Sequence, residues 1–91
     1  MKVSLDLAGA KNVDDARTRL AVFLFQADIF VKVAAHCAHD KMLAAGLSQP
    51  EIIEAHDSAS RKWEAIRAAM KARSQREIDE MFHTGARAVH A

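Results

Sequence analysis

The stretch from Leu20 to Val31 is the feature that most constrains how this chain can fold. Ten of its twelve residues are apolar, and neither glycine nor proline interrupts it. Wound as a helix at about 100° per residue, it carries apolar side chains over most of its circumference. Only a narrow arc around Asp28, Lys32 and His39 is left for water. One neighbouring helix covers roughly a third of a helix's circumference, so we expect this helix to need two packing partners.

The composition favours an all-α fold in one domain, residues 1–91. The 19 alanines, three glycines and one proline favour helix over a turn-rich β fold. A chain of 91 residues is near the size at which a single core gives marginal stability. With 13 basic and 12 acidic residues, the formal net charge of +1 gives no general attraction to nucleic acid or to an anionic membrane.

The expected location is the cytoplasm, including the cytosol of an infected bacterial host. The single cysteine, Cys37, excludes an internal disulfide and fits a reducing compartment. No signal peptide is recognised at the N-terminus. We expect no membrane span, because Gln26, Asp28 and Lys32 interrupt the apolar stretch.

Residues 1–11 are expected to form an extended or flexible arm. Met1, Val3, Leu5 and Leu7 alternate with polar residues, which is the period of a half-buried strand. No second strand-like segment is present to pair with it. Three alternatives remain open: the arm pairs with its copy in a second subunit, packs along the helices, or is disordered.

The first helix is predicted over residues 13–44. Asn12 is a favourable N-cap, and Asp14 and Asp15 place negative charge in the first turn, where the helix dipole favours it.

The link between the two helices is the best-specified local feature. Gly46 can adopt the left-handed conformation of a helix stop, and Leu47 can then contact Met42 as in a Schellman motif. Ser48 begins the next helix with Glu51 three residues later, which is a capping box. So short a link predicts an antiparallel helical hairpin.

The second helix is predicted over residues 49–83, with Gly85 as its stop. Ser74 followed by Glu77 could instead cap a separate short helix from about residue 75, so a break near Ser74 is left open. The expected inward stripe comprises Ile52, Ala55, Ala59, Trp63, Ile66 and Met70, continued by Ile78, Met81 and Phe82.

The wide apolar surface of the first helix favours a homodimer. Two hairpins would make a four-helix bundle with the first helices at its centre. The alternative is a monomer in which a third helix folds over the exposed side. The residues expected at the dimer or core interface are Val22, Phe23, Phe25, Ile29, Phe30, Val33, Trp63 and Ile66.

The sequence offers no convergent chemical site. His36, Cys37, His39 and Asp40 are close in sequence but point in different directions on a helix, whereas metal ligands must converge on one point. There is no glycine-rich phosphate loop and no spacing that suggests a nucleophile with its base. We therefore expect no catalytic residues, no cofactor, no metal and no enzymatic activity.

A basic run on the second helix is the candidate partner-binding surface: Arg61, Lys62, Arg67, Lys71, Arg73 and Arg76. Such residues commonly belong to a solvated helix whose long side chains cover the edge of the core. The functional alternative is a surface for an acidic partner or for nucleic acid.

One resemblance covers about residues 16–70. Phe25-Gln26-Ala27-Asp28 in a hydrophobic first helix, a short turn, and Lys62-Trp63 on the second helix resemble the small all-helical anti-CRISPR proteins of the type I-E class from phages. The resemblance implies a homodimeric inhibitor that binds a component of the CRISPR interference machinery, such as its nuclease-helicase, and blocks it sterically. It implies no role for any particular residue.

The leading hypothesis is therefore a non-enzymatic protein–protein interaction module, an inhibitor of phage or mobile-element origin. Its partners would be a second copy of itself and a host protein, for instance a CRISPR-associated protein. The alternative is a DNA-binding transcriptional regulator that uses the basic second helix. A third hypothesis is a purely structural oligomer.

Overall fold

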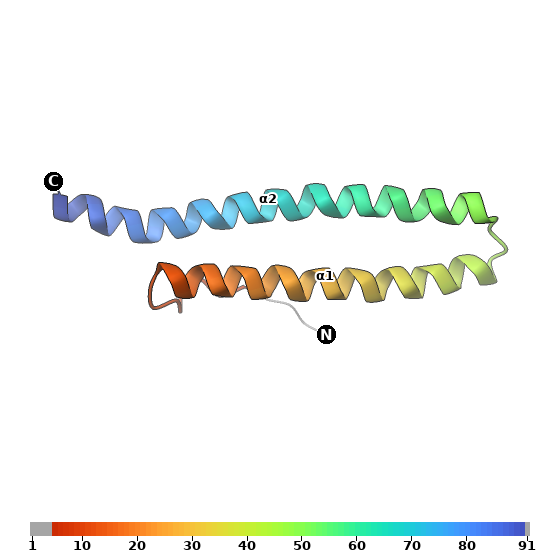
Figure 1. The fold of residues 1–91 in the computed structure, drawn as a ribbon, viewed down its shortest axis with the longest axis horizontal. Coiled ribbons are helices and arrows are strands. Elements are labelled where there is room, and N and C mark those ends of the chain that lie inside the picture. Colours follow the sequence, from red (N-terminus) through yellow and green to blue (C-terminus); the bar gives the residue numbers. More distant parts are fainter. Residues whose placement is uncertain (1–4, 91) are drawn as a thin grey trace.

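The chain forms a hairpin of two long antiparallel helices (Figure 1). The computed structural model describes the backbone of residues 5–90 and the side chains of residues 5–82. Helix α1 spans Val13–Ala44 and helix α2 spans Gln49–His90. Residues 5–90 contain no strand, which confirms the predicted all-α helical hairpin. The hairpin is a thin rod, with extents of 64 × 22 × 13 Å.

Helix α1 begins at the predicted cap. The side chain of Asn12 accepts a hydrogen bond of 2.8 Å from the backbone N–H of Asp15. The backbone N–H of Lys11 donates a hydrogen bond of 2.9 Å to the Asp15 carboxylate. This bond lowers the pKa of Asp15, because it stabilises the charged form.

The turn between the helices is the predicted Schellman motif. Gly46 has a φ of +80°, in the left-handed region. The Leu47 N–H donates to the carbonyl of Met42 at 3.1 Å, and the Gly46 N–H donates to that of Leu43 at 3.0 Å. These two bonds satisfy carbonyls that a helix end otherwise leaves unpaired.

Helix α2 begins with the predicted capping box. The Ser48 N–H donates to the Glu51 carboxylate at 2.9 Å, and the Glu51 N–H donates to Ser48 Oγ at 3.4 Å. The bond from the Ser48 N–H lowers the pKa of Glu51. Gly46, Leu47 and Ser48 carry both the end of α1 and the start of α2. Because the link is so short, α2 must fold back along α1.

Helix α2 is longer than predicted and has no break. It runs through Ser74 and Gly85 to His90, so the predicted end at His83 is wrong, and of the two alternatives left open near Ser74 the structure has the unbroken helix. Ser74 is buried against the hairpin instead of capping a new helix. Ile78, one turn later, is fully buried, and this packing holds one continuous helix against α1. The alternative in which a third helix covers α1 is thereby excluded.

The best-packed core lies near the open end of the hairpin. Its buried members are Leu7, Ala16, Leu20, Leu24 and Ile78. Partly buried residues surround them: Leu5, Ala10, Val13, Phe23 and Phe82. Leu5 and Leu7 belong to the N-terminal arm, so residues 5–12 follow the second of the three alternatives and pack along the helices. Met1 and Val3 lie outside the described residues.

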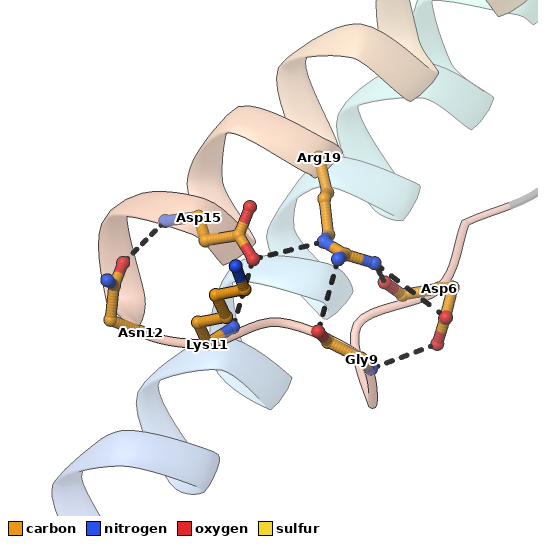
Figure 2. Close-up of polar contacts among 6 residues, drawn as sticks. All are labelled: Asp6, Gly9, Lys11, Asn12, Asp15 and Arg19. Atoms are coloured by element: carbon orange, nitrogen blue, oxygen red, sulfur yellow. Dashed lines mark hydrogen bonds and ion pairs between the residues drawn. The ribbon is translucent and has the colours of Figure 1, made fainter.

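Arg19 on α1 fastens the N-terminal arm (Figure 2). Its guanidinium donates to the backbone carbonyls of Asp6 and Gly9, each at 3.1 Å. It also pairs with the carboxylate of Asp15, at 3.3 Å, and with that of Asp6, at 3.7 Å. One side chain thus bridges the arm and the first turns of α1.

The inward side of α2 is rotated relative to the predicted stripe. Four predicted members are exposed: Ala55, Ala59, Ile66 and Met81. His56 and Arg67 are half-buried in the seam between the helices. The reason is that α1 presents polar partners to both, as the contacts of Asp28 and His39 below show.

Candidate interaction surface

Helix α1 carries a face of large apolar side chains that nothing in the described structure covers. We call it the outward α1 face. Its members, with exposed fractions, are Val22 (48%), Phe25 (65%), Ile29 (40%), Phe30 (46%) and Val33 (55%). All five were predicted at the dimer or core interface. In the single chain they reach solvent, so they do not form its core.

The outward α1 face points away from α2 because one helix can cover only one side of α1. The side that meets α2 carries Leu20, Leu24 and Ala27, which are all buried. Ile29 and Val33 lie roughly 140° and 180° around the helix from Leu24, at 100° per residue. The sequence prediction that a single partner leaves α1 incompletely covered is therefore consistent with this hairpin.

The other three predicted interface residues have different environments. Phe23 packs against the buried cluster at the open end. Trp63 is half-buried in the seam, whereas Ile66 is 53% exposed on α2. The predicted set therefore divides into residues that pack within the chain and residues that are exposed to solvent.

The sequence predicted Asp28 on a solvated arc of α1. In the structure it lies in the seam between the two helices. Its carboxylate accepts a hydrogen bond from the Trp63 indole Nε1 at 2.9 Å and from Arg67 Nε at 3.0 Å. These donors, Arg67 first, lower the pKa of Asp28 against the opposing effect of desolvation. Asp28 therefore lies against α2 beside the buried Leu20, Leu24 and Ala27, whereas Lys32 of the predicted polar arc is exposed.

His39 repeats this arrangement nearer the turn. Its Nδ1 lies 3.1 Å from Nε2 of His56, and the two rings stack with centroids 5.4 Å apart. His39 was predicted on the solvated arc, but its ring stacks on His56 and is half-buried. With His36, Lys32 and Ala35, the pair lines a surface hollow of about 290 Å³.

Hairpin register could have predicted both contacts. In an antiparallel hairpin with its turn at residues 45–48, partners have residue numbers that add up to a nearly constant value. Asp28 with Trp63 and His39 with His56 both fit this register. Sequence reasoning missed them because it assigned polar residues to solvent before pairing the two helices.

The side chains considered as metal ligands do not converge on one point. His36, Cys37 and Asp40 are all exposed on α1. Among the described side chains, no group of three or more histidine, cysteine, aspartate or glutamate residues is placed to hold a metal ion.

Three of the six residues in the predicted basic run, Arg61 to Arg76, are paired with carboxylates. Arg67 bonds Asp28 as described, Arg61 lies 4.0 Å from Glu54, and Arg73 lies 3.5 Å from Glu77. The remaining three are exposed: Lys62, Lys71 and Arg76. The basic run therefore carries less uncompensated charge than its sequence suggests.

By length and composition, α1 also qualifies as a candidate membrane span, with a mean hydropathy of 1.6 over its most apolar window. The same test is passed by the core helix of a soluble protein, which is mostly buried, and by a signal sequence; in this structure 11% of the window is buried. The expected cytoplasmic location stays a prediction.

No protein family, curated protein or solved structure matches this chain in the comparisons made. The chain is therefore described by its own structure, as a two-helix hairpin with an exposed apolar face on its first helix.

Proposed function

We propose that this protein is a small non-enzymatic module that acts by binding other proteins. The observation that carries the proposal is the outward α1 face, whose five large apolar side chains are each 40 to 65% exposed. Contiguous apolar patches of this kind on soluble chains mark interaction sites. Covering such half-exposed side chains contributes about 1 kcal/mol each, so the whole face favours association by several kcal/mol.

The spacing of the face indicates the kind of partner. Val22, Phe25, Ile29 and Val33 follow one another by three, four and four residues along one side of α1. This is the pattern with which a helix inserts into a groove or packs into a helical bundle. A partner with a helical or grooved apolar surface fits it.

In its specific form, the proposal is an inhibitor of phage or mobile-element origin. It would bind a component of a type I-E CRISPR system in the bacterial cytoplasm and block it sterically. The resemblance of Phe25-Gln26-Ala27-Asp28 and Lys62-Trp63 to anti-CRISPR proteins supports this form. An inhibitor that acts by steric blocking needs a binding surface but no reactive group.

A plating assay tests the inhibitor. In a bacterium whose type I-E system targets a phage, expression of the chain is expected to raise the plating efficiency of that phage by at least tenfold. The double variant Phe25→Asp/Ile29→Asp is expected to lose this effect. Ile53→Asp, at an α2 residue that is 52% exposed, is the matched control and should retain it. Soluble wild-type chain that gives no protection would reject the anti-CRISPR form.

A DNA-binding regulator is the second candidate. The observation in its favour is a hollow of about 350 Å³ between the helices that is bordered by Arg17, Arg67 and Lys71. A mobility-shift assay at two salt concentrations tests it, because binding through phosphate contacts falls steeply with salt. No shift at low salt would remove this candidate.

A further inference from the structure

We propose that the outward α1 face binds a second copy of this chain, with the two α1 helices antiparallel and Ile29 of each copy near the two-fold axis. This inference rests on the proposed role of the face as a binding surface, and it names a second copy of the chain as the molecule bound there. The result is a four-helix arrangement with α1 and its copy in the middle and the two α2 helices outside.

The poor core of the single hairpin argues for a partner that is always present. Among the described side chains of α1, none beyond Ala27 is buried. From Val31 to Ala44 the helix is held by half-buried contacts, including those of His39 and Met42. Chains of this size with so little core are stabilised by oligomerisation. A second copy is present wherever the chain is made, whereas a foreign target is not.

The area of the face matches a dimer interface. A buried aromatic side chain covers about 200 Å², and aliphatic side chains cover somewhat less. At their observed exposures, the five side chains present roughly 400 to 500 Å² of apolar surface. A standard interface buries about 800 Å² per partner, of which about 65% is apolar in homodimers. The outward α1 face supplies most of that apolar share.

The N-terminal arm favours the antiparallel arrangement. The arm lies beside the N-terminal half of α1, where Leu5 and Asp6 border a hollow shared with Val22 and Phe23. In a parallel pair the two arms would crowd the same end of the interface. In an antiparallel pair each arm lies near the C-terminal half of the other copy's α1, and opposed helix dipoles also favour this arrangement.

This arrangement fixes which residues meet. With Ile29 at the axis, Phe25 lies opposite Val33 of the second copy, so a large side chain packs against a smaller one. Val22 then lies opposite His36 of the second copy. Val22 and its own counterpart are about 21 Å apart along the interface, at 1.5 Å per residue.

Cysteine cross-linking tests the arrangement in a Cys37→Ser background. On mild oxidation, Ile29→Cys and the double variant Val22→Cys/His36→Cys are expected to form covalent dimers. Val22→Cys alone is expected to stay monomeric on a denaturing gel. Efficient cross-linking of Val22→Cys alone would overturn the antiparallel arrangement, and Ile53→Cys on α2 is the control for random collision.

The oligomeric state tests the pairing itself. Sedimentation of the wild-type chain, of mass 10.0 kDa, is expected to give twice that mass, and its Tm is expected to rise with protein concentration. Phe25→Asp is expected to shift the mass to one chain or to lose helical circular dichroism, whereas Ile53→Asp should remain a dimer. The concentration dependence of the wild-type Tm tests the pairing even if Phe25→Asp does not fold. A monomer with a concentration-independent Tm would overturn the pairing.

The two proposals can fail separately. A monomeric chain that still protects a phage would reject the pairing and keep the inhibitor. A dimer that gives no protection would keep the pairing and reject the inhibitor.

Discussion

Trp63 donates a hydrogen bond of 2.9 Å from its indole nitrogen to the carboxylate of Asp28, across the seam between α2 and α1. Arg67, one turn further along α2, donates to the same carboxylate at 3.0 and 3.1 Å. These contacts act together with the buried Leu20, Leu24 and Ala27 of α1, which face α2 on the same side of the helix. The Phe25 side of α1 consequently faces away from α2, where a partner can reach it.

Replacing Asp28 should weaken the hairpin. Asp28→Ala leaves the donors of Trp63 and Arg67 without their acceptor, and a hydrogen bond to a charged group contributes roughly 1.5 to 3 kcal/mol. Because a third of the Asp28 side chain is exposed, solvent screening reduces this to about 1 kcal/mol. Urea denaturation followed by circular dichroism measures the change. Asp40→Ala, at an exposed aspartate of the same helix, should leave the midpoint unchanged.

Acid should destabilise the protein through the same carboxylate. The pKa of Asp28 in the folded chain lies below its ordinary value of 3.8. A lowered folded pKa contributes stability that is complete above pH 3.8 and is lost as the pH falls through the folded value. The unfolding free energy should therefore decline below pH 3.8, and less steeply in Asp28→Asn. Equal slopes in both proteins would contradict this assignment.

Gly46→Ala should cost about 1 kcal/mol of stability, because a Cβ is unfavourable in the left-handed conformation. A Cβ at this position would meet no other atom within 4 Å, so the cost arises from the backbone alone. Gly46→Asn should cost less, since asparagine tolerates this region better. Thermal unfolding of both variants measures the difference. Equal losses would indicate that the turn is specified by something other than φ.

Arg19→Ala should release the N-terminal arm. The variant loses the donors to the carbonyls of Asp6 and Gly9 and the ion pair with Asp15. Leu7 would then leave the core more often. Limited proteolysis should cut residues 5–11 faster than in the wild type, while α1 and α2 stay helical. Arg17→Ala, at an exposed arginine of the same helix, is the control and should change little.

The start of α1 and the two helix ends at the turn could be predicted closely from the sequence. Asn12, Gly46 and Ser48 act through atoms within a few residues of themselves, so their roles do not depend on the rest of the fold. The far end of α2 could not be predicted in this way. Gly85 does not end the helix, and Ser74 does not begin a new one. Near Ser74, the packing of buried Ile78 keeps the helix continuous.

The sequence by itself determined that two helices fold back on each other and that apolar side chains cover more of the circumference of α1 than one neighbouring helix can bury. Helical periodicity gives the angular order of side chains but does not state which arc meets the neighbour. Only the tertiary structure decided that Asp28 and His39 lie against α2, beside the buried Leu20, Leu24 and Ala27. The physical reason is that residues distant in sequence, Trp63, Arg67 and His56, supply hydrogen bonds there. That choice leaves the outward α1 face exposed.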